Sequence, residues 1–475
     1  EMANIRDQCS WVHSVTPEIA TQKSVELVKM AVARAELLSS LEPGTLAVDQ
    51  KGLVIGGGLS GMTAALALAN QGFKVHLVER TERLGGHLHD IHFTLEETDV
   101  AGMTAGLIEQ VQNHKNIDVY LAADVADIKG HIGEFHATLS QNDKKFEVTG
   151  GIVIVATGAE RAETTKFLGG TSPNVITQVE LEKRICENTL PGGAKNVVMI
   201  QCAGSRDDER AYCSRICCSM AVKNALAIKK KSPDANVFVL YRDIRTYGFR
   251  ELYYKQAREA GVVFIRYTRE QEPVVSETGG LKVSLTSPDF PESLVIETDL
   301  VVLSTGVEAD RTNNKRVSDM LKVPLNADGF YVEAHMKLRP VDFATEGIFL
   351  CGLAHSPKFM DESIAQARAT AARAATVLSK THLDVSPQVS YVDQSKCISC
   401  MTCVHACPYG APFCNNDGKG QIEAAKCMGC GICASECPAR AIQLNHFQTD
   451  QFRVMIRQLF GDGNAAPQEK VPVKV

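Results

Sequence analysis

Short apolar runs alternate with helical patterns along most of the chain, and the clearest unit begins near residue 46. Residues 51–55 form an apolar run that ends in three glycines. Residues 60–70 carry the small apolar side chains of a closely packed helix, and a second apolar run covers residues 74–78. This order predicts a strand, a helix and a second strand, which together form a β-α-β unit.

Further apolar strands are separated by segments with helical periodicity. They are predicted at residues 151–155, 196–200, 236–241, 300–303 and 347–351. Strands that alternate with helices favour helical layers on a parallel sheet, so we expect an α/β fold. Residues 21–41 predict a helix that ends before Pro43. Residues 450–459 predict a short amphipathic helix near the C-terminus.

The length of the chain predicts two or three folded units. The composition is that of a folded protein. Of 475 residues, 44% are hydrophobic and 22% are charged, and the net charge is −6. Because there is also no Lys/Arg tract, these values argue against a nucleic-acid binder. No apolar stretch has the length of a membrane span, and the first residues lack a signal-peptide pattern. We therefore expect a cytoplasmic protein.

Cysteine is the unusual component, with 16 residues gathered mostly in tight clusters. Near the C-terminus the pattern C-x2-C-x2-C-x3-C-P occurs twice. This is the bacterial ferredoxin pattern, in which the fourth cysteine of each repeat ligates the other [4Fe–4S] cluster. The predicted ligand sets are Cys397, Cys400, Cys403 and Cys437 for one cluster, and Cys427, Cys430, Cys433 and Cys407 for the second. Zinc sites are the alternative, but zinc fingers do not use this triple spacing.

A glycine fingerprint, G-x-G-x-x-G, follows the first predicted strand and opens the first predicted helix. Glycines let the backbone approach a pyrophosphate, and the helix N-terminus stabilises its charge. Glu79 ends the next strand and can accept hydrogen bonds from ribose hydroxyls. The pattern predicts a dinucleotide site, with a ligand-free glycine turn as the alternative. Its expected contacts are Gly56, Gly58, Leu59, Ser60, Gly61 and Glu79.

Other stretches resemble flavoproteins with two dinucleotide-binding domains, such as thioredoxin reductase. The resemblance lies in an E-R pair, a G-G turn, an A-T-G turn and the segment at residues 345–352. It implies FAD, with further contacts at Arg80, Gly85, Gly86, His87, Val125, Ala156, Thr157, Gly158 and Gly352. Where those proteins have an aspartate after the second flavin glycine, this chain has Leu353. We therefore expect the ring edge to be contacted by Lys358 and by a helix start at Ser363, Ile364, Ala365 and Gln366.

The second glycine fingerprint of that group, which binds NAD(P)H, is replaced here. After the strand at residues 196–200 the chain reads QCAGSR, and side chains at the glycine positions block a pyrophosphate. Four thiols follow this strand, at Cys202, Cys213, Cys217 and Cys218. They predict a third [4Fe–4S] cluster, with a run of buried or redox-active thiols as the alternative. Cys186, Cys351 and Cys414 are predicted to be packed thiols.

Four long stretches resemble the HdrA component of heterodisulfide reductase and its bacterial relatives. They are IRDQCSWVH at 5–13, CAGSR…YCSRICC at 202–218, YRDIRTYGFR at 241–250 and GLAHSPK at 352–358. The resemblance implies an FAD- and iron–sulfur-dependent subunit of a cytoplasmic complex in anaerobic metabolism, which works in electron bifurcation or its reverse. It also implies that Lys223, together with Lys358, tunes the flavin. A plain surface lysine is the alternative for Lys223.

The same resemblance implies partners. These are HdrB- and HdrC-like subunits, or hydrogenase or NADH-oxidising subunits, with ferredoxin as electron partner and a second copy of the chain in a homodimer. Two other functions stay open: an NAD(P)H-linked flavin oxidoreductase, and a subunit that only relays electrons.

The expected architecture is a thioredoxin-reductase-like fold with two dinucleotide-binding domains, followed by a ferredoxin domain for two [4Fe–4S] clusters. The predicted domains are an N-terminal helical segment (1–45), the FAD domain in two parts (46–190 and 310–386), a former NAD(P)H-type domain with an iron–sulfur site (191–309), the ferredoxin-like domain (387–446) and a C-terminal helix and tail (447–475).

Overall fold

A computed structural model describes residues 1–142, 144–190, 195–290 and 292–460. The chain forms two compact units, and the larger one is residues 48–381. The smaller unit joins residues 1–47 to the chain that follows residue 381. The N-terminal helical segment therefore packs with the C-terminal part. The predicted tail after residue 460 lies outside the described residues.

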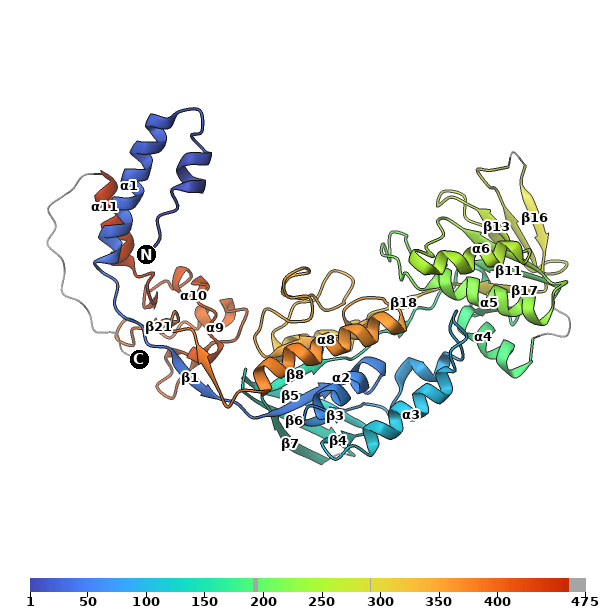
Figure 1. Cartoon of the computed structure of the whole chain (residues 1–475), viewed down its shortest axis with the longest axis horizontal. Helices are drawn as coiled ribbons and strands as arrows, with labels where there is room; N and C mark the ends of the chain where they lie inside the picture. The colour runs from blue at the N-terminus through green and yellow to red at the C-terminus, as the bar shows by residue number, and fades with distance from the viewer. Residues whose placement is uncertain (143, 191–194, 291, 461–475) are drawn as a thin grey trace. The chain divides into compact units, whose positions relative to one another are not determined.

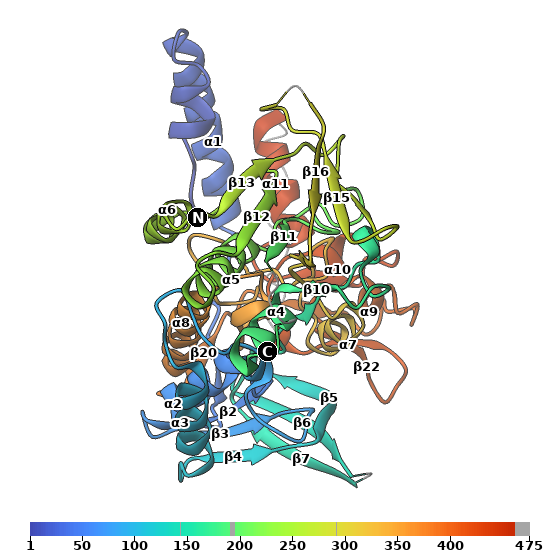
Figure 2. The ribbon, with the colours of Figure 1, turned by 90° about the vertical axis from the view of Figure 1, so that its right-hand side faces the viewer.

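The larger unit begins with a parallel sheet in the order β19-β8-β2-β3-β4. Its strands are β2 (Lys51–Ile55), β3 (Lys74–Val78), β4 (Ile117–Tyr120), β8 (Ile152–Val155) and β19 (Ile348–Leu350). One side carries the helices α2 (Leu59–Ala69), α3 (Val100–Gln112) and α8 (Met360–Leu378), and the other the antiparallel strands β5 (Ala123–His131), β6 (Glu134–Gln141) and β7 (Lys144–Gly150) (Figures 1 and 2). Because both faces are covered, the central strands are continuous apolar runs.

Small residues let two helices approach each other closely on this sheet. Helix α2 buries Ala64 and Ala65 completely, and its neighbour α8 buries Ala367, Ala371 and Ala374 completely. Alanine has no side-chain rotamers to lose, so this packing costs little conformational entropy. The close approach places the N-termini of both helices at the same edge of the sheet.

A second parallel sheet follows in the same unit, in the order β10-β17-β11-β12-β13. Its strands are β10 (Val175–Thr177), β11 (Asn196–Ile200), β12 (Asn236–Tyr241), β13 (Val263–Arg266) and β17 (Leu300–Leu303). Its two layers are the helices α4 (Gln178–Glu187), α5 (Cys217–Lys231) and α6 (Glu251–Glu259), and the antiparallel strands β14 (Val274–Ser276), β15 (Lys282–Leu285) and β16 (Leu294–Glu297). Two such α/β layers in one unit form the two-dinucleotide-binding fold that the sequence predicts.

Two short strands carry the chain between these sheets. Strand β9 (Glu160–Arg161) pairs antiparallel with β18 (Val307–Glu308). Beyond β18, helix α7 (Arg311–Leu321) is capped by Asp310, whose side chain accepts a hydrogen bond from the N–H of Asn313. This N-cap satisfies a donor that the first helical turn leaves free.

The smaller unit contains the cysteine repeats and two helices that pack side by side, α1 (Pro17–Ala35) and α11 (Thr449–Phe460). Arg34 lies over the ring of Phe447, with 4.6 Å between its guanidinium carbon and the ring centroid. Three antiparallel strand pairs complete the unit: β1 (Gly44–Ala47) with β20 (His382–Val385), β21 (Ser390–Val392) with β24 (Ile442–Leu444), and β22 (Pro412–Cys414) with β23 (Gly420–Ile422). Its short helices are α9 (Thr402–Ala406) and α10 (Ile432–Ser435).

Most predicted elements are confirmed, several of them to the residue, as in β2, β3, β11, β12 and β17. The N-terminal helix is an exception, because it begins at Pro17 and ends at Ala35 instead of covering residues 21–41. Proline is favoured at the first helical position, where its missing N–H costs nothing. The helix start predicted at Ser363 is also wrong, since α8 begins at Met360.

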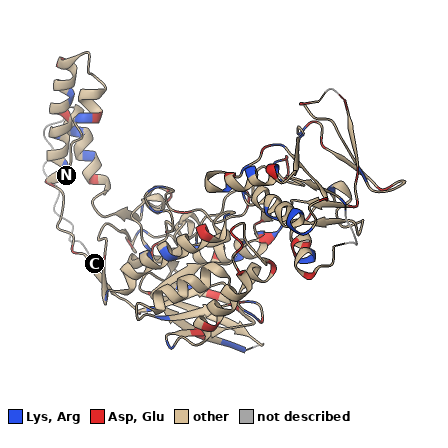
Figure 3. Cartoon of the chain, turned by 45° about the vertical axis from the view of Figure 1, so that its right-hand side comes forward, with Lys and Arg blue, Asp and Glu red and all other residues tan. Residues whose placement is uncertain are grey.

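Basic and acidic residues are interspersed along the chain in Figure 3, in keeping with 50 Lys and Arg against 56 Asp and Glu. Among the helices of the described residues, none combines the length and the apolar character needed to cross a membrane.

Candidate functional site

Each of the three fingerprint glycines has a different local surrounding. Gly56 has a φ of 109°, and a Cβ there would collide with the carbonyl oxygen of Ala156. A Cβ on Gly61 would collide with the carbonyl oxygen of Gly56, so this glycine lets α2 approach the strand end. A Cβ on Gly58 would meet nothing within 4 Å. The open space beside Gly58, at the N-terminus of α2, suits a pyrophosphate.

Glu79 lies against this glycine loop, as the sequence predicts for an acid at the end of β3. One carboxylate oxygen accepts the N–H of Gly57 at 2.7 Å, and the other accepts the N–H and the hydroxyl of Thr81, each at 2.8 Å. The next residue, Arg80, donates to Asp310 at 2.8 Å. The acid is thus held at the loop by backbone donors, in the place where a ribose hydroxyl binds in such sites.

A cavity of about 1240 Å³ extends from the glycine loop to the second sheet. Most of the predicted flavin contacts line it: Gly56, Gly58, Leu59, Ser60, Glu79, Arg80, Gly85, Gly86, His87, Val125, Ala156, Thr157, Gly158, Lys358, Ser363 and Ile364. Four predicted contacts are not part of its lining as described, namely Gly61, Gly352, Ala365 and Gln366. Ala365 is exposed on α8, which begins a turn earlier than predicted.

Three residues of the cavity lining carry buried polar atoms that have no hydrogen-bond partner among the described residues. They are the amide nitrogen of Gln178 and the hydroxyls of Ser219 and Ser304. Gln178 and Ser304 directly follow β10 and β17, and Ser219 is in the first turn of α5. Buried polar groups are nearly always satisfied. These atoms therefore fit a polar ligand in the cavity, such as the edge of a flavin ring.

Lys223 also faces this cavity, and the interpretation as a surface lysine is wrong because only 7% of the residue is exposed. Its ammonium lies 2.6 Å from the carboxylate of Glu182 and donates to the carbonyl of Phe93 at 2.8 Å. Burial lowers the pKa of Lys223, and the charge of Glu182 opposes that shift. The pair carries one positive and one negative charge into the cavity wall.

Lys358 is the second cation in the lining. Its ammonium donates to the carbonyl oxygens of Gly352 at 2.7 Å and Ser356 at 2.8 Å. Burial lowers the pKa of Lys358 to about 8, and Arg215 acts in the same direction, whereas Glu362 opposes it. Its positive charge is therefore complete well below pH 8 and is lost as the pH rises through that value.

The four thiols that follow β11 are near enough to act on one another electrostatically. Burial raises the pKa of the Cys217 thiol, and Cys218, Cys202 and Cys213 add to the rise. Cys217 also lines the cavity that begins at the glycine loop. A set of four cysteine thiols fits the four ligand positions of a [4Fe–4S] cluster.

The turn that replaces the second glycine fingerprint has an unusual backbone. Alternate residues have positive φ, at 59° for Cys202, 66° for Gly204 and 58° for Arg206. The N–H groups of Ala203 and Ser205 donate to the carbonyl oxygens of Ser304 and Cys202, so backbone hydrogen bonds hold this conformation.

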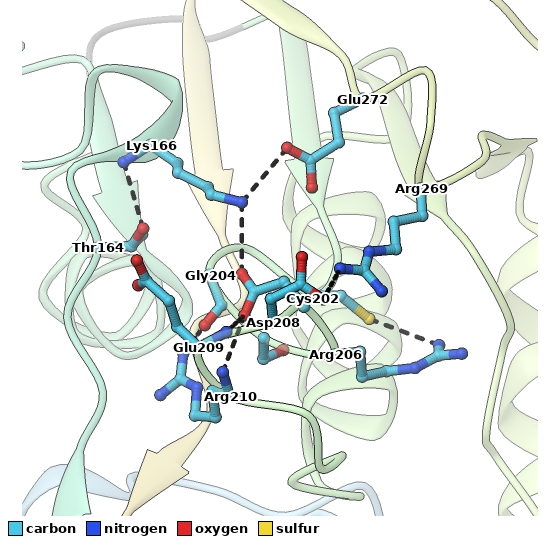
Figure 4. A network of polar contacts seen from close by, with 12 residues as sticks. Thr164, Lys166, Cys202, Gly204, Arg206, Asp208, Glu209, Arg210, Arg269 and Glu272 are labelled. Carbon is cyan, nitrogen blue, oxygen red and sulfur yellow. Dashed lines mark hydrogen bonds and ion pairs between the residues drawn. The ribbon is translucent and has the colours of Figure 1, made fainter.

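Arginines lie around this turn, and Figure 4 shows two of them, the half-buried Arg206 and the buried Arg210. Arg206 lies 3.8 Å from the Cys202 sulfur, and both Arg210 and Arg242 donate to carbonyl oxygens of the turn. Within the described chain, Arg242 Nε and both amide atoms of Gln201 have no hydrogen-bond partner. Because these cations offset negative charge, the residues fit an anionic cluster at this place.

The eight ferredoxin cysteines surround two hollows in the smaller unit. Cys397, Cys400, Cys403 and Cys437 line one, and Cys407, Cys427, Cys430 and Cys433 line the other. Both sets are those that the crossed ferredoxin pattern predicts. Backbone N–H groups of Gly420 and Ser390 approach the sulfurs of Cys397 and Cys427, each at 3.4 Å. In the described residues, no three Cys, His, Asp or Glu side chains converge on a point where one metal ion could bind.

The loops of the two repeats have the same backbone conformation at positions where their residues differ. Ser399 and Met401 in the first repeat have φ of 61° and 58°, and Gly429 and Gly431 at the same places in the second have 64° and 79°. Each loop therefore turns through two left-handed residues. This conformation costs a non-glycine residue about 1 kcal/mol.

Three cysteines outside these sets were predicted to be packed thiols. Cys351 is completely buried, as predicted. Cys186 and Cys414 are exposed, so the prediction is wrong for them. Cys186 is on the outer part of α4, and Cys414 ends β22 beside a tight turn, where neighbouring side chains cannot cover it.

Comparison with known proteins places the chain in a family. Residues 54–114 match an NAD(P)-binding Rossmann-like domain, and residues 390–413 and 421–443 match the 4Fe-4S binding domain. A relative from Methanopyrus kandleri, one of two iron–sulfur A-subunits of its CoB–CoM heterodisulfide reductase, is 35% identical over 97% of this chain and 85% of its own length. The chain belongs to the HdrA family of heterodisulfide reductase subunits.

Other members and one solved structure complete the comparison. The A-subunit of an H2:CoB–CoM heterodisulfide,ferredoxin reductase from Methanothermobacter thermautotrophicus is 34% identical over 96% of this chain and 83% of its own length. Thioredoxin reductase from Lactococcus lactis is 17% identical, over 69% of this chain and 99% of that chain, with a TM-score of 0.47. Membership in the HdrA family makes the chain an oxidoreductase component that binds [4Fe–4S] clusters.

Sequence reasoning missed several residues of this family member's cavity, notably Glu182, Phe93, Gln178, Ser219 and Ser304. The sequence could have predicted Gln178 and Ser304 as ligand contacts, because residues just after parallel strands often contact ligands. Glu182 and Phe93 had none, since they meet Lys223 only through the packing of separate segments.

The glycine loop allows a matched pair of substitutions. Gly58→Ala should leave the stability unchanged, because its methyl group meets open space, but should weaken dinucleotide binding by more than about tenfold. Gly61→Ala should destabilise the larger unit by about 1–3 kcal/mol, because its Cβ meets the Gly56 carbonyl. Thermal unfolding and flavin fluorescence quenching separate the two effects. Equal flavin affinity in Gly58→Ala and wild type would exclude the pyrophosphate from this loop.

The ferredoxin repeats allow a second pair of substitutions. Each of two glycines in the second repeat is replaced by the residue at the same place in the first repeat. A Cβ on Gly429 would lie 2.5 Å from the carbonyl oxygen of Gln388, whereas one on Gly431 would lie 3.8 Å from Leu444. Gly431→Met should keep both clusters at a cost of about 1 kcal/mol, and Gly429→Ser should lose the neighbouring cluster. Iron, sulfide and absorbance in the visible range measure the result, and full iron in Gly429→Ser would contradict the backbone geometry.

Proposed function

We propose that the chain is an FAD- and iron–sulfur-dependent electron-transfer subunit that splits electron pairs between two acceptors, or merges them in the reverse direction. The observation that carries the proposal is the position of Cys217. It belongs to the set of four thiols and also lines the cavity of the glycine loop. A one-electron carrier held there would share a wall with the flavin site.

The flavin assignment rests on residues that fit FAD. The loop at Gly58 and the N-terminus of α2 would hold the pyrophosphate, Glu79 the ribose, and the unpartnered atoms of Gln178, Ser219 and Ser304 the polar ring edge. Bound FAD supplies the exchange of electrons singly or in pairs. Lys223 and Lys358 would place positive charge at the ring and stabilise negative charge that arrives with electrons.

Three cluster sites are proposed, two in the ferredoxin domain and a third at Cys202, Cys213, Cys217 and Cys218. Clusters carry electrons one at a time, so a flavin with clusters in both units of the chain can send the two electrons of a pair to different places. This arrangement favours the splitting of electron pairs over a simple relay of electrons.

The names of the relatives suggest the partners. They are subunits of heterodisulfide reductases, and one name includes ferredoxin. We infer that this chain works with HdrB- and HdrC-like subunits, or with hydrogenase or NADH-oxidising subunits, and exchanges electrons with ferredoxin. A homodimer and a cytoplasmic location belong to the same proposal.

An NAD(P)H-linked oxidoreductase is less well supported. Its pyrophosphate would have to bind after β11, where the turn that begins at Cys202 has carbonyl oxygens already bonded to Arg210 and Arg242. Those arginines close the place that a glycine loop leaves open. Rapid reduction of the flavin by NADH alone would favour this alternative.

Iron content tests the third cluster. The wild-type chain should hold about twelve irons, and Cys217→Ser should hold about eight while still binding flavin, because each [4Fe–4S] cluster contributes four. Cys186→Ser is the matched control, since that thiol is exposed and outside the four-thiol set. About eight irons in the wild type, reconstituted under anaerobic conditions, would remove the third cluster.

A reductive titration tests the splitting of electron pairs and the role of Lys223. The wild-type flavin should take up two electrons in one step. Lys223→Met should make reduction harder by on the order of 1–2 kcal/mol, because Glu182 then leaves uncompensated negative charge at the ring. The double variant Lys223→Met/Glu182→Gln should recover most of this loss. Two well-separated one-electron steps in the wild type would contradict the splitting of pairs.

A further inference from the structure

The turn after β19 is held from both sides at Gly352. Its carbonyl oxygen accepts the ammonium of Lys358 at 2.7 Å, and its N–H donates to the side-chain oxygen of Gln366 at 2.9 Å. Gly352 has a φ of 75°, and a Cβ there would collide with the hydroxyl of Ser60 at the start of α2. The turn therefore adjoins the helix N-terminus of the glycine loop.

The hydrogen bonds continue beyond Gln366. Its side-chain nitrogen lies 2.8 Å from Nδ1 of His355, and Nε2 of the same ring lies 2.8 Å from a carboxylate oxygen of Glu333. Three side chains from separate parts of the larger unit thus form one line that ends on the backbone of Gly352. His355 and Glu333 are mostly buried, with 21% and 15% of their side chains exposed.

Hydrogen-bond chemistry fixes which group donates and which accepts at each step of this line. The oxygen of Gln366 accepts from Gly352, so its NH₂ group faces His355 and must donate to Nδ1. Nδ1 then carries no proton, and the ring proton is on Nε2, where it donates to Glu333. Every donor meets an acceptor only while His355 is neutral. A proton on Nδ1 would face the NH₂ group and turn the amide away from Gly352.

We propose that Glu333, His355 and Gln366 form a positioning relay that orients Gly352, and through it Lys358, at the flavin site while His355 is neutral. The relay takes the place of the aspartate that Leu353 replaces in this chain. None of its three members lines the cavity as described, so they act through Gly352 and Lys358. The proposal rests on the proposed flavin function and adds the residues that hold its second contact.

The charges around His355 favour the neutral ring. Burial lowers the pKa of His355 most, the positive charge of Lys358 lowers it further, and Glu333 opposes both. Lys358 and Glu333 are the charged groups that act on the ring, and Gln366 on α8 is neutral. The relay is therefore closed at neutral pH and opens as the pH falls below the ordinary histidine range.

Two substitutions change the pH profile of flavin binding in different ways. In His355→Ala the line is broken at every pH, and the flavin dissociation constant should rise about tenfold. In Gln366→Glu the ring lies between two carboxylates, which stabilise its protonated form. That relay closes at low pH and opens as the pH rises, the reverse of the wild type.

The experiment measures the flavin dissociation constant and midpoint potential of the full chain from about pH 5 to 9, a range that spans histidine titration. His136→Ala is the matched control, because His136 pairs with Glu134 on the exposed face of β6 and does not line the cavity. The expected result is a reversed profile in Gln366→Glu and wild-type values in His136→Ala. A Gln366→Glu profile parallel to that of the wild type would overturn the relay.

A second measurement separates this proposal from the flavin assignment. Nitrogen NMR of histidine-labelled, ligand-free chain reads the His355 tautomer without any cofactor. The relay requires a proton on Nε2 and none on Nδ1 at neutral pH. The opposite tautomer would overturn it even if FAD binds, whereas the expected tautomer in a chain that fails to bind FAD would overturn only the flavin function.

Discussion

The burial of negative charge is the constraint on which this structure depends. The Glu79 carboxylate and most cysteines of the candidate cluster sites are buried or half-buried, and an uncompensated charge is costly there. The chain offsets this cost mainly with backbone N–H groups. Gly57 and Thr81 donate to Glu79, and Gly420 and Ser390 approach cluster sulfurs.

Several of the candidate sites also contain residues with positive φ. Left-handed turns recur at the glycine loop, after β11 and in both ferredoxin repeats. At Cys202, Ser399 and Met401 the chain accepts this conformation without glycine. Such strain is expected where a site over-determines the backbone.

The two parallel sheets show how one architecture supports two kinds of chemistry. After β2, glycines leave open space for a ligand at a helix N-terminus. At the equivalent place after β11, thiols and buried arginines fill that space. The end of β2 and Cys217 at the start of α5 line one cavity, so an electron carrier at Cys217 and a dinucleotide at Gly58 would share it.

Local patterns determined much of this from the sequence alone. Strand boundaries followed from apolar runs, the cluster sets from cysteine spacing, and the glycine loop from its fingerprint, because each depends on residues near one another in the chain. Only the tertiary structure decided that Lys223 is buried against Glu182, that Cys186 is exposed, and that Glu333, His355 and Gln366 form one line. These contacts join segments far apart in sequence, and their energies depend on burial, which the fold creates and the local sequence does not encode.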